Sequence, residues 1–259
     1  MSAQPRDAAT VLLLRDSADG LQVFMVKRNA MVDFMAGAHV FPGGKIDPDD
    51  GALAPRLRGE IGAGASAAHY VAAIRETFEE AGVLLGGAFG TADLDRFNSA
   101  IAGGETFATI VEKLGCVLDL SQLIPWTRWV TPAVSPKRFD AVFFLAAAPA
   151  GQAARHDQGE TIESLWIDPS IALECVQRGS MLIAPATYKC LCILSGHGSV
   201  ADAFAAARAS PPRVWCPVVK MESGRRLVIL SDDPEHPDRY TRMPGPTRMA
   251  FEGGRFLPV

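Results

Sequence analysis

Residues 75–83 read Arg-Glu-Thr-Phe-Glu-Glu-Ala-Gly-Val, and they close the stretch that decides the fold. At the α-helical period of about 100° per residue, this stretch separates an apolar stripe from an acidic face. The apolar stripe consists of Val71, Ile74 and Phe78. The acidic face consists of Glu76, Glu79 and Glu80. Ser66 is a suitable N-cap and Gly82 a suitable C-cap, so we predict a helix over residues 66–81 that buries one face.

The acidic face needs an explanation because like charges at i,i+4 destabilise a helix by a few tenths of a kcal/mol. A divalent cation bound to Glu76, Glu79 and Glu80 would relieve this repulsion, and oxygen ligands of this kind favour magnesium or manganese over zinc. The alternative is a solvated acidic face, with Arg75 in an ordinary surface ion pair with Glu79.

The segment upstream favours the first interpretation. A short strand over residues 38–41 ends at Phe41-Pro42-Gly43-Gly44, and residues 45–65 have the composition of a loop. Together with residues 75–83, this block resembles the Nudix box, G-x5-E-x7-R-E-U-x-E-E-x-G-U, of the Nudix hydrolase superfamily. The chain departs from the pattern in three places. Thr77 stands where the hydrophobic residue after the first helix glutamate is expected. Asp50 stands where the first glutamate is expected, and an insertion of about seventeen residues (51–67) precedes the helix.

A second motif narrows the resemblance. The spacing of Arg28, Gly37 and Phe41-Pro-Gly-Gly44 is similar to a motif of coenzyme A pyrophosphatases, although Asn29 and Asp33 replace a small residue and an arginine. Trp129-Val-Thr-Pro132 and Pro136-Lys-Arg-Phe-Asp140 also look like the coenzyme A diphosphatase branch, which carries an interrupted box. The resemblance covers roughly residues 8–195.

The resemblance implies a set of site residues. Glu76, Glu79, Glu80 and the carbonyl of Gly44 would hold Mg²⁺ or Mn²⁺. The catalytic residues would be Glu79, Arg75 and Glu160. Arg75 would orient a glutamate rather than touch substrate. The general base would be a glutamate of the box or one from a later loop. Of the later candidates, Glu160 is preferred over Glu163, which is expected to be a surface charge. The substrate would contact Arg28, Phe41, Gly43, Lys137 and Arg138.

The pattern of strands and helices predicts a mixed α/β fold, and the resemblance implies a Nudix-type α/β/α sandwich with a mixed sheet. We expect a hairpin over residues 8–28, strands near 126–131, 138–147 and 161–167, and helices over 169–178, 186–195 and 199–208. Two short helices, broken at Gly103-Gly104, would form an insertion over 93–114. Residues 1–210 would form the hydrolase domain, and 211–259 a C-terminal extension packed on it, with strands over 214–221 and 225–230.

Composition sets the remaining limits. Hydrophobic residues make up 48% of the 259 residues, which is enough for a large core and excludes general disorder. A net charge of −4 argues against non-specific nucleic-acid binding. Five scattered cysteines show no zinc-binding spacing and suit a reducing compartment. No apolar run reaches the length of a membrane span, so we expect a cytoplasmic protein without a membrane partner.

The sequence therefore predicts a metal-dependent hydrolase of a nucleotide pyrophosphate bond. Its substrate would be coenzyme A or acyl-coenzyme A, giving adenosine 3′,5′-bisphosphate and phosphopantetheine. Two alternatives stay open: a hydrolase of another nucleoside diphosphate derivative, such as ADP-ribose or NADH, and a non-catalytic ligand sensor with the same fold. The expected partner is a small-molecule nucleotide substrate. The C-terminal extension could also pair with a second subunit, so a homodimer is possible.

Overall fold

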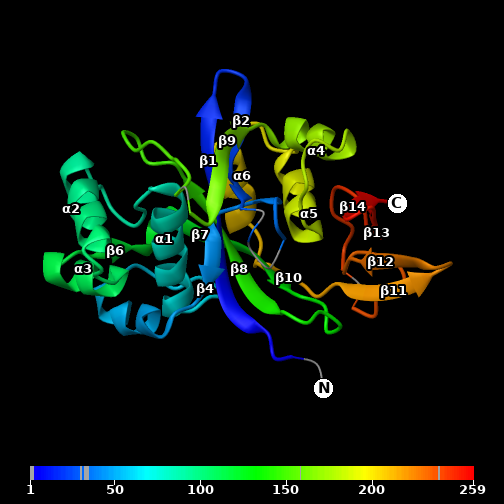
Figure 1. The fold of residues 1–259 in the computed structure, drawn as a ribbon, viewed down its shortest axis with the longest axis horizontal. Helices are drawn as coiled ribbons and strands as arrows, with labels where there is room; N and C mark the ends of the chain where they lie inside the picture. Colours follow the sequence, from blue (N-terminus) through cyan, green and yellow to red (C-terminus); the bar gives the residue numbers. More distant parts are fainter. Residues whose placement is uncertain (1–2, 30, 32–34, 158, 239) are drawn as a thin grey trace.

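A mixed β-sheet of eight strands forms the middle layer of the molecule, with helices on both faces (Figure 1). The computed structural model describes residues 3–29, 31, 35–157, 159–238 and 240–259. One face is covered by α1 (Ala67–Ala81), α2 (Thr91–Ala102) and α3 (Phe107–Leu114), and the other by α4 (Pro169–Gln177), α5 (Pro185–Leu194) and α6 (Val200–Arg208). This arrangement confirms the predicted α/β/α sandwich.

The sheet follows the order β10-β7-β8-β1-β2-β3, with β4 also paired to β1 and β9 to β2. Its strands are β1 (Arg6–Ser17), β2 (Gly20–Arg28), β3 (His39–Val40), β4 (Gly43–Lys45), β7 (Leu123–Val130), β8 (Phe139–Ala147), β9 (Thr161–Ile167) and β10 (Arg213–Trp215). The β1–β8 and β10–β7 pairs are parallel, whereas the β1–β2 hairpin and the other pairs are antiparallel. The sheet is therefore mixed, as predicted.

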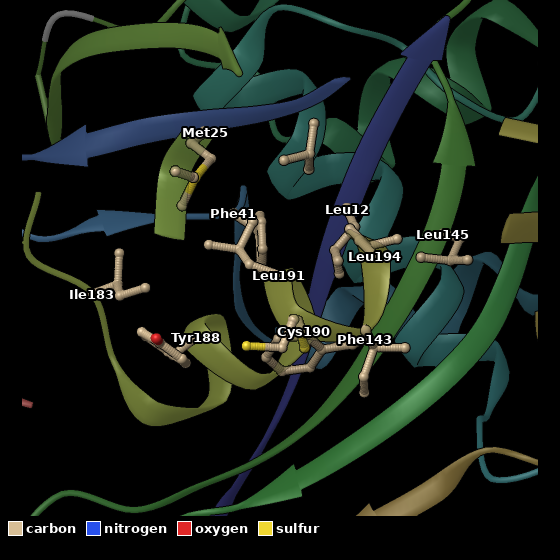
Figure 2. Close-up of a cluster of buried hydrophobic side chains, with 14 of the residues drawn as sticks. Leu12, Met25, Phe41, Phe143, Leu145, Ile183, Tyr188, Cys190, Leu191 and Leu194 are labelled. Atoms are coloured by element: carbon tan, nitrogen blue, oxygen red, sulfur yellow. The ribbon is translucent and has the colours of Figure 1, made fainter. Parts of the chain in front are cut away.

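The central strand β1 is buried on both faces, and its alternation divides the core in two. Ala9, Val11 and Leu13 belong to the core under α1–α3. Leu12 and Leu14 belong to the core under α4–α6, where Leu12 lies with Leu191 and Leu194 of α5 (Figure 2). Because successive side chains of a strand point to opposite faces, one apolar run serves both layers.

Helix α1 forms as its sequence predicts. Ser66 has extended backbone angles at the N-cap, where its N–H donates to Nδ1 of His69 at 3.2 Å. Gly82 ends the helix in the left-handed conformation with φ of 66°, which glycine adopts without strain. Val71, Ile74 and Phe78 are buried in the core under α1–α3. The packing of this stripe fixes the rotation of the helix, and so the direction of its acidic face.

The prediction that residues 45–65 form a loop is wrong in part. Residues Pro48–Arg56 form a 3₁₀ helix, followed by β5 (Leu57–Arg58), which pairs with β6 (Leu118–Asp119). The N–H of Asp47 donates to Oδ2 of Asp50 at 2.7 Å, and Pro48 supplies a pre-set φ at the first position. This local capping, rather than apolar periodicity, orders the segment. A further 3₁₀ turn, Leu120–Gln122, precedes β7.

Residues 211–259 contribute one strand to the main sheet and a second sheet of their own. The second sheet consists of β11 (Val218–Glu222), β12 (Arg225–Ile229), β13 (Arg248–Glu252) and β14 (Arg255–Pro258), and it lies beside α5 (Figure 1). The strand expected over 214–221 is split at Pro217, which cannot donate to a sheet. Trp215, Leu230 and Met249 are buried in the same core as α5.

A buried ion pair also joins the extension to α5. Lys189 Nζ donates to Asp232 Oδ2 at 2.7 Å, and both side chains are fully buried. Two carbonyls, those of Met243 and Pro246, accept from the same ammonium at 3.4 and 3.1 Å. Within the described part of the chain, no helix is both long and apolar enough to cross a membrane.

Candidate active site

An acidic cavity of about 260 Å³ opens beside the C-terminal half of α1. It is lined by Lys45, Asp47, Glu76, Glu79, Glu80, Asp157 and Glu160. Four of these residues were predicted from the sequence, and they come together although more than seventy positions separate α1 from Glu160. The sheet brings them together because β9, which follows Glu160, pairs with β2 next to the edge where β4 meets β1.

Arg75 organises the acidic face from within. Its Nε and Nη2 donate to the two carboxylate oxygens of Asp50 at 2.9 and 3.0 Å. Its Nη1 donates to Glu76 at 2.8 Å and to Glu79 at 3.0 Å, and Nη2 also donates to the carbonyl of Lys45 at 2.9 Å. All five N–H groups therefore have a partner. Arg75 is 7% exposed, and its hydrogen bonds hold the carboxylates of Glu76 and Glu79.

Asp50 is the acidic partner that the sequence left unassigned. It lies in the 3₁₀ helix, is 2% exposed and binds Arg75 in a bidentate pair. It thus occupies the place of the box's first glutamate with a side chain one methylene shorter. The insertion of about seventeen residues begins within the same 3₁₀ helix and continues through β5 to α1, and the Asp50–Arg75 pair forms across it.

Burial makes ionisation of the acidic face costly. Desolvation raises the pKa of Glu76 to about 7, against the charge and hydrogen bond of Arg75, which lower it. Desolvation also raises the pKa of Glu80 to about 8, although a hydrogen bond from the Gly43 N–H opposes the shift. The pKa of Glu79 is raised by burial as well. Glu76 and Glu80 therefore bind protons readily near neutral pH, and a bound cation would compete with those protons.

The turn at Gly43-Gly44 brings backbone against the carboxylates. The N–H of Gly43 donates to Oε2 of Glu80 at 3.0 Å. A Cβ at Gly43 would lie 2.7 Å from Cα of Thr10 on the paired strand, and a Cβ at Gly44 would collide with the carboxylate of Glu76. The backbone contact at position 43 requires glycine. The contact at position 44 is with the movable end of Glu76 and shows how closely the Gly44 backbone approaches the acidic face.

The acidic cavity fits a divalent cation by its donor chemistry. It offers several carboxylate oxygens and a backbone segment that no side chain shields, which are the ligands that magnesium and manganese prefer. The described residues contain no three acidic, His or Cys side chains that already converge on a single point. Glu76 and Glu79 are instead held by Arg75, and Glu80 by Gly43.

Other predicted residues lie outside the cavity lining. Phe41 is 3% exposed and packs with Met25 and Leu12 in the core under α4–α6 (Figure 2). The guanidinium of Arg138 donates to the carbonyls of Thr131 and Ala3 at 3.0 and 2.8 Å. Roles for Phe41, Arg138 and its neighbour Lys137 at the substrate stay predictions.

Arg28 lies at the end of β2, and its charge lowers the pKa of Glu80, which places it near the cavity. Glu163 forms an exposed ion pair with Lys27 at 3.2 Å, the surface charge expected of it. Asp33, where the coenzyme A motif has an arginine, lies outside the described residues.

Sequence reasoning missed three lining residues: Lys45, Asp47 and Asp157. Lys45 and Asp47 lie one and three residues after Gly44, so their closeness to the glycine turn was a signal for them. Asp157 lies in a loop without periodicity, three residues before Glu160, and nothing in the sequence distinguished it from other loop carboxylates.

A family model described as the NUDT19 Nudix domain matches residues 60–194, which is more than half of the chain. Putative nudix hydrolase 7 of Caenorhabditis elegans is 30% identical over 70% of this chain and 57% of that protein, so the chain spans little more than half of that relative. Acyl-coenzyme A diphosphatase NUDT19 of Gallus gallus is 27% identical over 91% of this chain and 81% of that protein.

Among solved structures, a NUDIX hydrolase from Alicyclobacillus acidocaldarius superposes with a TM-score of 0.66 at 28% identity, over 81% of this chain and 98% of that chain. The fold and the acidic helix, together with these comparisons, define the chain as a Nudix pyrophosphohydrolase. Within this class, it belongs to the NUDT19 Nudix domain family. Nudix hydrolases generally use divalent metal ions.

Proposed function

We propose that this hydrolase cleaves the pyrophosphate bond of coenzyme A or acyl-coenzyme A. Water would attack one phosphorus of the pyrophosphate and the bridging P–O bond would break, giving adenosine 3′,5′-bisphosphate and phosphopantetheine or its acyl form. The Gallus gallus relative, which is named an acyl-coenzyme A diphosphatase and matches most of the chain, supports this choice of substrate.

The observation that carries the hydrolytic mechanism is the single cavity shared by Glu76, Glu79, Glu80 and Glu160. We propose that the three helix glutamates and the carbonyl of Gly44 hold Mg²⁺ or Mn²⁺. Bound there, a divalent cation neutralises phosphate charge and lowers the pKa of water. Because Glu76 and Glu79 both accept from Arg75 while Glu80 accepts from Gly43, at least one of these carboxylates would rotate to bind the cation.

The chain's own residues supply the remaining chemistry. Glu160 faces the acidic helix across the cavity, and its charge raises the pKa of Glu80. In the proposed mechanism Glu160 accepts the proton of the attacking water. In the same mechanism Arg75 holds Glu76 and Glu79 in position, and Arg28, at the end of β2, contacts a phosphate oxygen of the substrate.

A substrate panel tests the proposal. Purified protein is incubated with magnesium or manganese and with coenzyme A, an acyl-coenzyme A, ADP-ribose, NADH or a diadenosine polyphosphate. We expect the two coenzyme A substrates to give the highest kcat/KM, with adenosine 3′,5′-bisphosphate as product. A clear preference for ADP-ribose or NADH would contradict the proposed coenzyme A substrate and favour the other nucleotide. No hydrolysis of any compound would favour the non-catalytic sensor.

A further inference from the structure

The loop before β9 carries Glu160, and its conformation is set by hydrogen bonds on two sides. Both Asp157 and Glu160 line the cavity, three residues apart in the chain. Glu160 itself is exposed, and a long exposed side chain loses considerable rotamer entropy when it is ordered. Its backbone must therefore be held firmly if the carboxylate is to meet a bound substrate in a defined place.

Asp157 holds the loop from within. Its Oδ1 accepts from the Thr161 N–H at 2.9 Å and from the Thr161 hydroxyl at 2.5 Å, and its Oδ2 accepts from the Glu160 N–H at 3.0 Å. Thr161 is fully buried as the first residue of β9. Burial opposes ionisation of Asp157, but these hydrogen bonds hold its pKa below the ordinary value. Both oxygens are thus directed at the loop's own backbone.

Asn29 holds the same loop from the end of β2. Its backbone N–H donates to the carbonyl of Glu160 at 2.8 Å, and its side-chain amide donates to the carbonyl of Gly159 at 3.3 Å. Its Oδ1 accepts from the N–H of Met31 at 3.1 Å, which fixes the orientation of the amide. A small residue at position 29 could make the first of these contacts but neither of the side-chain contacts.

We propose that Asp157 and Asn29 are positioning residues that clamp the backbone of Glu160 from two sides and so aim its carboxylate into the cavity. This inference rests on the proposed role of Glu160 in pyrophosphate hydrolysis. It explains why Asn29 replaces the small residue of the coenzyme A motif, and it assigns Asp157 to the loop rather than to a metal ion or a proton transfer.

A double-mutant cycle tests the clamp, because a residue that acts only through Glu160 has no effect once Glu160 is removed. We expect Glu160→Gln to lower kcat at least 100-fold. Asp157→Asn should lower kcat about 10-fold or more and change KM less than 2-fold. The double variant should match Glu160→Gln within 2-fold. A further 10-fold loss in the double variant would show that Asp157 acts directly and would overturn the proposal.

Asn29→Ala provides a second arm that does not depend on the folding of the Asp157 variant. It should lower kcat about 3- to 10-fold and have no effect in the Glu160→Gln background. Asp95→Asn, an exposed carboxylate on α2, is the matched control and should leave kcat unchanged. Unchanged kcat in both Asp157→Asn and Asn29→Ala would also refute the clamp.

The experiment separates this inference from the proposed substrate. If the wild type does not hydrolyse coenzyme A but hydrolyses another member of the panel, the cycle is measured on that compound, since the clamp requires only a pyrophosphate bond. If Glu160→Gln hydrolyses the substrate at the wild-type rate, Glu160 is not the general base and the clamp has no catalytic purpose. The roles of the helix glutamates would still be tested independently.

Discussion

Replacing Glu80 with glutamine should make the metal-free protein more stable and the enzyme inactive. Glu80 is 6% exposed, and burial raises its pKa to about 8 from an ordinary value of 4.5. Glutamine has the same shape, and its carbonyl oxygen can still accept from Gly43. The substitution therefore removes the ionisation without opening a cavity or leaving the Gly43 N–H unpaired.

The magnitude follows from proton linkage. Because the pKa is raised on folding, the folded state binds more protons than the unfolded state between pH 4.5 and pH 8. Stability from this group is complete below pH 4.5 and is lost as the pH rises toward 8. At 1.36 kcal/mol per pKa unit, the cost relative to a neutral side chain is under about 1 kcal/mol at pH 5 and about 3 kcal/mol at pH 7. For a chain of this size, about 3 kcal/mol corresponds to about 5 °C or more in Tm.

Thermal unfolding in excess chelator at pH 5, 7 and 8 measures this difference. The Tm advantage of Glu80→Gln should grow from pH 5 to pH 8, while Glu163→Gln, an exposed control, should differ little from wild type at each pH. Saturating magnesium should stabilise wild type more than Glu80→Gln, since the cation binds the ionised carboxylate.

In the same preparations, kcat of Glu80→Gln should fall at least 100-fold, which corresponds to about 2.7 kcal/mol of transition-state stabilisation. Equal Tm values at every pH would refute the buried-carboxylate argument, and a kcat equal to that of the wild type would remove Glu80 from the catalytic site.

Two further substitutions test buried ion pairs. Asp50→Ala leaves the buried Arg75 without its bidentate partner, so it should lower the free energy of unfolding by about 3 kcal/mol in a denaturant titration and also lower kcat. Asp49→Ala, at an exposed neighbour, should lower the free energy of unfolding by under about 0.5 kcal/mol. Asp232→Ala leaves the fully buried Lys189 without its ion-pair partner and should lower the free energy of unfolding of the full chain by about 3–5 kcal/mol. A loss of under about 1 kcal/mol would contradict the packing of the extension on the hydrolase core.

The sequence predicts the part of the site that a single helix carries. Glu76, Glu79 and Glu80 follow from helical period alone, because the apolar stripe on the opposite face fixes how the helix turns. Helix period also predicts α2 and α3, with the break at Gly103-Gly104, and strand patterns predict β7 to β9. These elements are local, so their residues determine them without reference to the rest of the chain.

Contacts between distant segments could not be predicted in this way. The Asp50–Arg75 pair crosses an inserted segment, and the spacing within the sequence no longer indicates it. Helix α5 carries Lys189, which is fully buried and paired with Asp232 of the extension, a contact between segments more than forty residues apart. Phe41 precedes the glycine turn, and its place in the core under α4–α6 depends on the burial of both faces of the sheet, which the motif does not indicate. Strands β13 and β14 were missed because each is short and only partly apolar.

The most direct test of the central claim is coenzyme A hydrolysis by wild-type protein, followed by product identification, with magnesium and then with excess chelator. The account predicts equimolar adenosine 3′,5′-bisphosphate and phosphopantetheine with magnesium, no turnover in chelator, and recovery when magnesium or manganese is restored. Undiminished hydrolysis in excess chelator would contradict the assignment of the acidic helix to a metal ion.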